Sequence, residues 1–446
     1  MARRTPALPL AFTFGLLLPL FGCGGDSANP TDPTTPNAGG ECSTLGQVNF
    51  VRDTMRDIYL WYHELPDPDP AGFDSPEAYL DAVRYRPLDS SFSYINSQAA
   101  SDAFFSDSQF IGVGVSYRQT SATELRVSQV FPGGPAATAG LARSDYLVSI
   151  GGRAVSELLQ TGEIATAFGP DQIGYAVDIA WRTTGGTELQ ATLVKQLVTI
   201  PTVSAVSTFD VRGSRVGYIF FRNFVTPSVE ALNTAFDQLL ADGATDLVLD
   251  LRYNGGGYVE VAQHLGGLIG GHGTAGQVFV DFQHNDKNTA RNSQLLLEDK
   301  PNALGVPRLV VITTGGSASA SELVINGLRP FMNVTVVGSR TFGKPVGQYS
   351  FDFCEKVLFP VSFVGENALG EADYYDGIPA DCGAADDLDH AIADPDEASL
   401  AEALFYLRSG RCSAQAAVEA EIQARSRAAR PRPYAGDGWR QLLGAH

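Results

Sequence analysis

The spacing of apolar residues changes along the chain, and each change predicts a different kind of structure. From Gln47 to Leu65 and from Ser75 to Tyr85, apolar residues recur at the intervals of an amphipathic helix. From about Phe110 to Leu197 the pattern becomes short apolar runs separated by Gly and Pro, which is typical of strands and turns. We therefore expect a small helical domain followed by a β-rich module. The expected strands of this module are Ile111–Tyr117, Leu125–Phe131, Tyr146–Ile150 and Ala176–Trp181.

The segment from Gly213 to about Ala393 alternates strand-like runs with helix-like stretches, which predicts a layered α/β core. The expected strands are Val216–Phe221, Asp246–Leu251 and Arg308–Thr313. The expected helices are Ser228–Asp242, Val259–Leu268 and Ser319–Leu328. A further amphipathic helix is expected from Glu397 to Arg408, whereas the Arg-rich tail from Arg425 to His446 has no pattern that predicts a structure.

The composition describes a globular protein with more than one domain. The chain has 446 residues, of which 44% are hydrophobic and 18% charged, and this length exceeds that of one ordinary hydrophobic core. Its 50 acidic side chains outnumber its 31 basic ones, which argues against nucleic acid or an anionic membrane face as the main partner. A peptide or a neutral substrate fits this charge better.

The first 22 residues have the pattern of a targeting segment that is removed. Arg3 and Arg4 precede an apolar run, Ala7 to Phe21, that is short for a bilayer-spanning helix. The run ends in Leu-Phe-Gly-Cys23, which resembles a bacterial lipobox. This resemblance implies that the thiol of Cys23 receives diacylglycerol and that Cys23 becomes the new N-terminus. The alternative is an ordinary cleaved signal peptide with an unrelated cysteine.

Residues 23–41 are rich in Gly, Pro, Thr and Asn and have little to bury, which predicts a flexible tether. Gly24, in place of Asp, gives no obvious signal for retention at the inner membrane. We therefore expect an exported protein, anchored by lipid in the cell envelope. In an envelope with two membranes, we place it on the periplasmic side of the outer membrane.

The remaining cysteines are even in number, which suits disulfide bonds in an exported chain. Up to two disulfides are expected, and three pairings are open. No Cys-x-x-Cys pair and no His-x-x-x-His spacing occurs, so we expect neither a metal nor another cofactor. The four cysteines are Cys42, Cys354, Cys382 and Cys412.

Two glycine-rich segments of the β-rich module resemble the signatures of a PDZ domain. The segment 112–115 looks like its carboxylate-binding loop, and Pro-Gly-Gly-Pro-Ala-Ala at 132–137 looks like its second signature. Such a loop offers backbone N–H groups to a terminal carboxylate while the peptide adds as a strand to a sheet edge. The resemblance implies that Val113, Gly114 and Val115 bind the C-termini of polypeptides. The alternative is a β-domain with structural glycines.

The most specific group of candidate catalytic residues lies where the third expected core strand leads into the following helix. The segment from Thr314 to Glu322 consists of small residues around Ser317, Ser319 and Ser321. Small residues at a helix start leave backbone N–H groups accessible, which suits a nucleophile and the oxyanion it generates. Serine is also a common helix N-cap, and this feature alone favours the cap.

Three segments together resemble the C-terminal processing (tail-specific) peptidases. Gly-Ser-Ala-Ser-Ala-Ser-Glu at 316–322 is followed by Thr-Phe-Gly-Lys at 341–344. Asp-Leu-Arg-Tyr-Asn-Gly-Gly-Gly at 250–257 is similar to the family's segment at the end of a core strand. The resemblance covers about residues 110–380 and implies a crotonase-like or ClpP-like β/α core.

By position, the resemblance assigns the nucleophile to Ser319, the general base to Lys344 and the orientation of that lysine to Gln348. It assigns the oxyanion hole to the backbone N–H groups of Gly256 and Ala320. Serine is a weak nucleophile until a base takes its proton. A lysine can be that base only if burial or a nearby positive charge lowers its pKa from about 10.4 toward neutrality.

Two departures from the family pattern concern the surroundings of Lys344. Pro345 stands where the family usually has Gly, and Gly-Ser-Arg stands at 338–340 where Gly-Glu-Lys is common. Pro345 removes one N–H and restricts Lys344 to extended backbone, which affects the shape of the site but not the type of chemistry. The alternative mechanism is a Ser-His-Asp triad. Its first candidate is His264, for which we favour a structural role.

The sequence thus predicts an α+β multidomain serine endopeptidase that cleaves exported polypeptides captured by a free C-terminus or an unfolded tail. The alternative is a non-catalytic PDZ-containing envelope lipoprotein that binds peptides or a small apolar ligand. A third class, an adaptor in transport or envelope assembly, would need only the PDZ domain and the anchor. The expected domains are a signal peptide (1–22), a tether (23–41), a helical cap domain (42–107), a PDZ domain (108–200), a protease core (201–395) and a C-terminal helix and tail (396–446).

Overall fold

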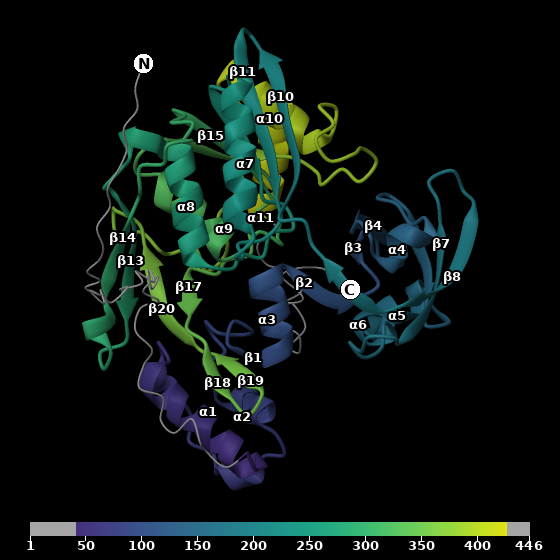
Figure 1. Ribbon diagram of the computed structural model, residues 1–446, viewed down its shortest axis with the longest axis vertical. Coiled ribbons are helices and arrows are strands. Elements are labelled where there is room, and N and C mark those ends of the chain that lie inside the picture. The colour runs from purple at the N-terminus through teal and green to yellow at the C-terminus, as the bar shows by residue number, and fades with distance from the viewer. Residues whose placement is uncertain (1–41, 426–446) are drawn as a thin grey trace, which may run out of the picture. The chain divides into compact units, whose positions relative to one another are not determined.

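The computed structural model describes residues 42–425, and the predictions for Cys23, the signal peptide, the tether and the Arg-rich tail lie outside this range. A six-stranded sheet forms the centre of the α/β core (Figure 1). Only the β10–β11 pair is antiparallel, and every other neighbouring pair is parallel. In order across the sheet, the strands are β10 (Val203–Val211), β11 (Ser214–Phe221), β12 (Asp246–Asp250), β15 (Arg308–Thr313), β16 (Asn333–Gly338) and β21 (Cys382–Gly383).

Helices cover both faces of this sheet, which explains why its strands are almost continuously apolar. On one face, α7 (Ser228–Ala241), α8 (Val259–Gly270) and α9 (Ala320–Leu328) pack against alternate residues of β11, β12 and β15. On the other face, α10 (Ala398–Ser409) and α11 (Ala414–Arg425) pack against the remaining residues of the same strands. Each face therefore has its own hydrophobic core.

A second, four-stranded sheet is formed by two segments of the chain that lie between strands of the six-stranded sheet, one between β12 and β15 and one between β16 and β21. Its order is β14 (Ser293–Leu296), β13 (Val278–His284), β20 (Val361–Glu366) and β17 (Val346–Gln348). A three-stranded sheet joins β1 (Tyr94–Ser97) to the hairpin of β18 (Phe351–Phe353) and β19 (Lys356–Phe359). The helices α1 (Thr44–Ile58) and α2 (Pro76–Val83) share one hydrophobic core with β17, β18 and β20. A third helix, α3 (Gln98–Asp107), follows β1.

The β-rich module has a sheet and a hydrophobic core of its own. The sheet order is β3 (Val115–Gln119), β4 (Leu125–Val130), β5 (Tyr146–Ile150), β7 (Ala176–Arg182) and β8 (Glu188–Val194), with β6 (Arg153–Ala154) paired to β5. Short helices α4 (Pro135–Ala139), α5 (Val155–Thr161) and α6 (Ile164–Ala167) complete it. The prediction of a single strand at Ile111–Tyr117 is wrong. Gly114, with φ +85°, breaks it into β3 and β2 (Gln109–Gly112), and β2 pairs instead with β9 (Gln196–Thr199).

Most of the expected core elements are present within a few residues of their predicted bounds. The helix expected from Gln47 to Leu65 ends at Ile58, since the backbone of Tyr59, with ψ 130°, leaves the helical conformation. The hydroxyl of Tyr59 donates to the buried Asp89. Two disulfides join Cys42 to Cys354 and Cys382 to Cys412, which selects one of the three open pairings. Within residues 42–425, no helix is long and apolar enough to cross a membrane.

Candidate active site

Ser319 lies at the junction between the loop after β15 and the start of α9. It is the residue immediately before the helix, and its backbone has φ 56° and ψ −115°. A positive φ is strained for a residue with a side chain, and such strain occurs mostly where the surrounding structure fixes it. The Ser319 N–H donates to Oε2 of Glu322 at 2.9 Å. The side chain of Ser319 is thus presented by a turn that the local hydrogen bonds hold in one conformation.

The two neighbouring serines differ from Ser319 in exposure and in partners. Ser317 and Ser321 are fully buried, whereas Ser319 is partly exposed. The Ser317 hydroxyl donates to the backbone oxygen of Leu251 at 2.8 Å, and the Ser321 hydroxyl donates to that of Asn254 at 2.8 Å. These two hydroxyls therefore join the Ser319 turn to the loop after β12.

Glu322 connects the turn of Ser319 to the segment of Lys344. Its buried carboxylate accepts four hydrogen bonds. Oε2 accepts from the N–H groups of Ser319 at 2.9 Å and Lys344 at 2.8 Å. Oε1 accepts from the Gly343 N–H at 2.7 Å and the Thr341 hydroxyl at 2.5 Å. Burial raises the pKa of Glu322, while these bonds act in the opposite direction. One carboxylate thus fixes the distance between two backbone segments.

The amine of Lys344 is enclosed, with only 7% of the residue exposed. Its Nζ donates to Oε1 of Gln348 at 2.5 Å and lies 6.0 Å from the ring centroid of Phe92. The Gln348 amide in turn donates to the backbone oxygens of Phe92 at 2.5 Å and Phe359 at 2.9 Å, so its orientation is fixed. Burial lowers the pKa of Lys344 to about 8, although the charges of Asp89 and Glu322 oppose the shift.

Gly256 packs directly against the Ser319 turn. A Cβ at this position would lie 2.9 Å from the Ala318 oxygen, the Ala320 nitrogen and the Cβ of Ser319. Its φ of +101° also requires glycine. The structure thus places both predicted oxyanion donors beside Ser319, but the Gly256 N–H already donates to Oδ1 of Asn254 at 2.9 Å. To donate to an oxyanion, this N–H has to share or leave that bond.

A buried ionic network holds the first residues of the loop after β12, the loop that contains Gly256. Arg252 pairs with Asp250 at the end of β12 and with both carboxylate oxygens of Glu397 at 2.7 Å. The Tyr253 hydroxyl donates to both oxygens of Asp386, at 2.7 and 2.8 Å. Tyr253 has φ 68°, so these side-chain bonds help to hold a strained backbone.

The predicted peptide-binding loop lies between β2 and β3. The side chains of Val113 and Val115 are fully buried in the core of the β-rich module. The backbone oxygens of Val113 and Gly114 accept from Ala136 at 2.8 Å and Phe131 at 2.9 Å. The side chains therefore have a structural role, and any ligand contact has to come from the backbone N–H groups.

The alternative base, His264, lies on α8 and its Nε2 is 2.9 Å from Oδ1 of Asn233 on α7. Burial lowers the pKa of this imidazole. Its partner is thus a side chain of the neighbouring helix, which fits the structural role that we favoured.

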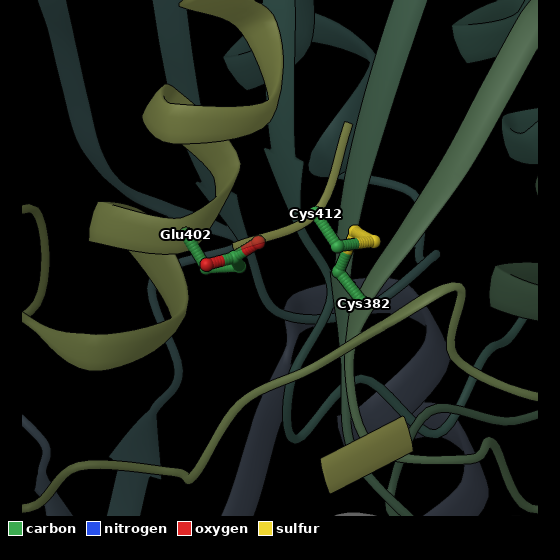
Figure 2. A group of neighbouring side chains, drawn as sticks. All are labelled: Cys382, Glu402 and Cys412. Atoms are coloured by element: carbon green, nitrogen blue, oxygen red, sulfur yellow. A yellow bond between two sulfur atoms is a disulfide. The ribbon is translucent and has the colours of Figure 1, made fainter. Parts of the chain in front are cut away.

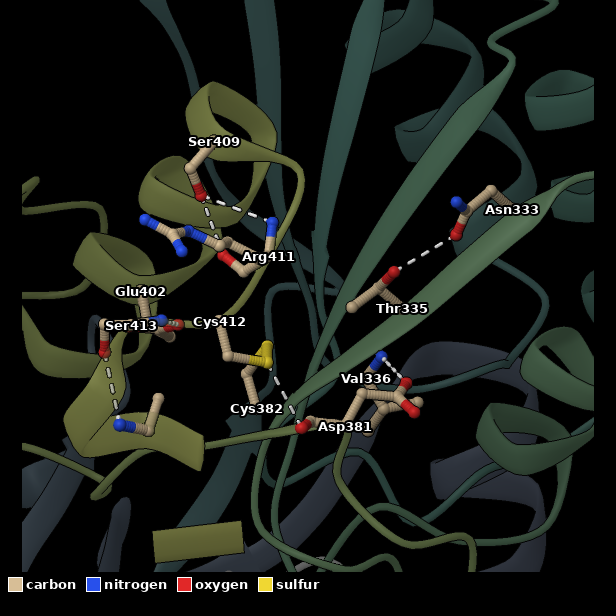
Figure 3. Close-up of a disulfide and its surroundings, with 11 residues drawn as sticks. Asn333, Thr335, Val336, Asp381, Cys382, Glu402, Ser409, Arg411, Cys412 and Ser413 are labelled. Carbon is tan, nitrogen blue, oxygen red and sulfur yellow. Dashed lines mark hydrogen bonds between the residues drawn. A yellow bond between two sulfur atoms is a disulfide. The ribbon is translucent and has the colours of Figure 1, made fainter. Parts of the chain in front are cut away.

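One group among residues 42–425 has three potential metal ligands within 4.8 Å of one another, namely Cys382, Cys412 and Glu402. Figure 2 shows that the two cysteines are joined to each other, with the Glu402 carboxylate beside them. Sulfur in a disulfide is not the thiolate that binds metals. The Glu402 carboxylate accepts from the Ser413 N–H at 2.9 Å, and the Cys412 sulfur contacts the Asp381 oxygen (Figure 3). This group therefore links α10, α11 and β21.

Sequence reasoning assigned no role to Glu322, Asn254 or Phe92, although all three contact predicted site residues. The spacing Ser319-x-x-Glu322 is that of a helix capping box, and this was the available signal for Glu322. Phe92 lies more than 250 residues before Gln348 in the chain, so no local pattern connects the two.

Comparison with known proteins agrees with this arrangement of segments. Residues 215–362 match the family model of peptidase family S41, and residues 46–94 match that of the peptidase S41 N-terminal domain. The carboxyl-terminal-processing protease of Synechocystis sp. is 29% identical over 247 residues, which are 55% of this chain and 55% of that protein. The carboxy-terminal processing protease CtpA of Bacillus subtilis is 25% identical over 268 residues, covering 60% and 54%. The chain thus spans about half the length of the curated relatives it matches.

A solved structure shows a similar fold. The crystal structure of a putative S41 protease from Bacteroides fragilis superposes with a TM-score of 0.64 and 24% identity, and the match covers 81% of this chain and 97% of that one. At this identity the likeness concerns the fold alone. Together with the two family models, which match the N-terminal segment and the core in the expected order, these findings show that the chain belongs to peptidase family S41, the family of the C-terminal processing peptidases.

Proposed function

We propose that the protein is a serine endopeptidase in which Ser319 is the nucleophile and Lys344 is its general base. The observation that carries this proposal is the enclosed Lys344 amine, whose pKa burial lowers to about 8. At pH 7 about a tenth of such amines are neutral, compared with fewer than about one in a thousand for an ordinary lysine. Only the neutral amine can accept a proton from the serine.

In the proposed reaction, Ser319 Oγ attacks the carbonyl carbon of a peptide bond and its proton passes to Lys344 Nζ. The C–N bond then breaks, and the proton moves from Lys344 to the leaving amine. Water attacks the resulting ester and gives a proton to Lys344. The bond between Ser319 Oγ and the carbonyl carbon then breaks, the proton moves from Lys344 to Oγ, and the new C-terminus leaves. Gln348 keeps the amine oriented throughout, because its own amide is fixed by two backbone oxygens.

The oxyanion formed in each step needs donors, for which we propose the N–H groups of Gly256 and Ala320. The close packing of Gly256 against Ser319 and Ala320 supports this. The Gly256 N–H has a competing acceptor in Asn254, so we expect this bond to lengthen when substrate is bound. The Ala320 N–H belongs to the first turn of α9, where the helix dipole favours negative charge.

We further propose that the β-rich module is a PDZ domain that captures polypeptide C-termini and delivers them to Ser319. The broken strand at Gly114 and the position of β3 at the edge of the module's sheet support this. We also propose that Cys23 carries a lipid anchor in the cell envelope, on the strength of the lipobox-like sequence.

The test uses protein beginning at residue 42 and an unfolded polypeptide, with products mapped by mass spectrometry. The parent should cleave, and Ser319→Ala should not, while an activity-based fluorophosphonate probe should label the parent at Ser319 only. An intact substrate together with an unlabelled Ser319 would favour the non-catalytic binding protein. Peptides with free and amidated C-termini, compared by titration calorimetry, test the PDZ proposal separately. Equal affinity for the two would exclude carboxylate capture.

A further inference from the structure

A fully buried carboxylate that the proposed mechanism does not use lies in the N-terminal segment. Asp89, between α2 and β1, accepts four hydrogen bonds. Its Oδ1 accepts from the N–H groups of Phe92 at 2.8 Å and Ser93 at 3.0 Å. Its Oδ2 accepts from the hydroxyls of Ser93 at 2.6 Å and Tyr59 at 3.0 Å. Four acceptor bonds on one carboxylate hold residues 89–93 in a single conformation.

The residue that this turn holds is Phe92, which contacts the candidate site in two ways. Its backbone oxygen accepts from the Gln348 amide at 2.5 Å, and its ring lies 6.0 Å from the Lys344 amine. The Gln348 side chain in turn orients the Lys344 amine, since its Oε1 accepts a hydrogen bond from Lys344 Nζ at 2.5 Å. A continuous series of hydrogen bonds therefore runs from Asp89 through Phe92 and Gln348 to the amine.

The same turn is joined to the sheet that carries Gln348. The Ser93 hydroxyl, which donates to Asp89, accepts from the Val361 N–H at 2.9 Å, and Val361 pairs with Gln348 in the β17–β20 ladder. A shift of the Asp89 turn would consequently move both the acceptor of the Gln348 amide and the strand opposite Gln348.

We propose that Asp89 is a positioning residue for Lys344, acting from the N-terminal segment through Phe92 and Gln348. The inference rests on the proposed function, because the position of the amine affects a rate only if Lys344 is the base. It goes beyond that function in making the N-terminal segment part of the catalytic apparatus. Without the turn, the serine, lysine and glutamine would all be present but the amine would lack a fixed direction.

Asp89 also acts on Lys344 through its charge, which provides a readout that a merely structural residue would not affect. The charged groups that act on the amine are Asp89 and, from α9, Glu322, and both raise the pKa of Lys344 against the larger effect of burial. Arg84, whose guanidinium donates to the Ser93 oxygen at 3.0 Å, and the Tyr59 hydroxyl face the same turn. Removing the charge of Asp89 should therefore lower the pKa of Lys344.

The first experiment compares Asp89→Asn with a matched control, Asp246→Asn. Asp246, at the start of β12, is also a buried aspartate, but its carboxylate pairs with Arg308 at the start of β15. Among the described residues it takes no part in the hydrogen bonds that lead from Asp89 to Lys344. For Asp89→Asn we expect a kcat about tenfold to a hundredfold lower with KM unchanged, as for other misplaced catalytic groups. The acid limb of its pH–rate profile should move to lower pH. For Asp246→Asn we expect a lower Tm with parental kcat and pH profile.

A second variant and a second measurement keep the inference testable if Asp89→Asn does not fold or if the parent does not hydrolyse peptides. Tyr59→Phe removes one of the four bonds and no charge, and it also removes the acceptor of the Tyr85 N–H. It should therefore lower kcat severalfold without moving the acid limb. The pKa of Lys344 can be followed by NMR of labelled lysine, since the chain has only five lysines. An inactive parent would refute the proposed function, while this titration would still decide whether Asp89 acts on Lys344. A parental kcat in Tyr59→Phe, or an unchanged Lys344 pKa in Asp89→Asn, would overturn the inference.

Discussion

Replacing Glu322 by Gln tests whether one carboxylate sets the geometry of the site. The change keeps the shape of the side chain but exchanges one acceptor oxygen for an amide that only donates. If the amide replaces Oε2, it faces two N–H groups, those of Ser319 and Lys344. If it replaces Oε1, it faces the Gly343 N–H and the Thr341 hydroxyl, and a hydroxyl can turn to accept. The second orientation should therefore be adopted, and in it the Gly343 N–H loses its acceptor.

The expected change in the free energy of unfolding follows from the hydrogen bonds that Glu322→Gln alters. One buried N–H loses its acceptor, at about 1–3 kcal/mol, and the bonds that remain become neutral and weaken by about 1 kcal/mol each. Part of this is offset because a neutral amide is easier to bury than an anion. We expect a net loss of about 2–4 kcal/mol in the free energy of unfolding, and a kcat one to two orders of magnitude lower because Gly343 adjoins Lys344.

The assay is cleavage of an unfolded polypeptide, with Tm measured on the same samples. Glu402→Gln is the matched control, because Glu402 is also a buried glutamate, but within residues 42–425 its carboxylate accepts a hydrogen bond only from the Ser413 N–H, and an amide oxygen can still accept that bond. Glu402→Gln should therefore retain parental kcat. Parental kcat and parental Tm in Glu322→Gln would refute the idea that this carboxylate holds the two segments together.

Four further predictions are tested by measurements of activity or stability. Because the neutral amine of Lys344 appears as pH rises through about 8, kcat should rise about tenfold from pH 7 to pH 9, and a flat profile would exclude this base. Lys344→Arg should be inactive, since a guanidinium does not lose its proton. Ser317→Ala and Ser321→Ala should each lower stability by about 1–3 kcal/mol and leave much of the activity, since in the part of the chain that the structure describes their hydroxyls bond only to backbone groups. Loss of activity without loss of Tm would contradict this. Replacing Cys42 and Cys354 by Ser should lower stability by up to about 5 kcal/mol, because this disulfide joins residues 312 apart, and an unchanged denaturation midpoint would count against it.

The sequence predicted the core elements well because their signals are local. Apolar runs and helical periodicity placed β11, β12, β15, α7, α8 and α9 close to their observed bounds. The break of β2 and β3 at Gly114 was missed, since the run of apolar residues continues through a glycine whose positive φ is visible only in the structure.

The parts of the candidate site that the sequence did not reveal depend on contacts between distant segments. Asp89 stands in a turn without periodicity, and its effect reaches Lys344 through Phe92 and Gln348. The competing acceptor of the Gly256 N–H, Asn254, is only two residues away, but a glycine-rich segment gives no sign of which N–H groups are already used. Motifs therefore identified the reacting groups, and the structure identified what orients them.

The disulfide between Cys42 and Cys354 has a mechanical consequence. Cys42 stands two residues before α1, so a pull on the preceding segment would ordinarily unwind that helix from its first turn. Here the pull passes through the sulfur atoms to the turn between β18 and β19, and α1 lies outside the path of the force. If the proposed lipid anchor holds the chain while a substrate is drawn into the site, the strain falls on this hairpin, and its second strand, β19, also accepts a hydrogen bond from the Gln348 amide at the Phe359 oxygen.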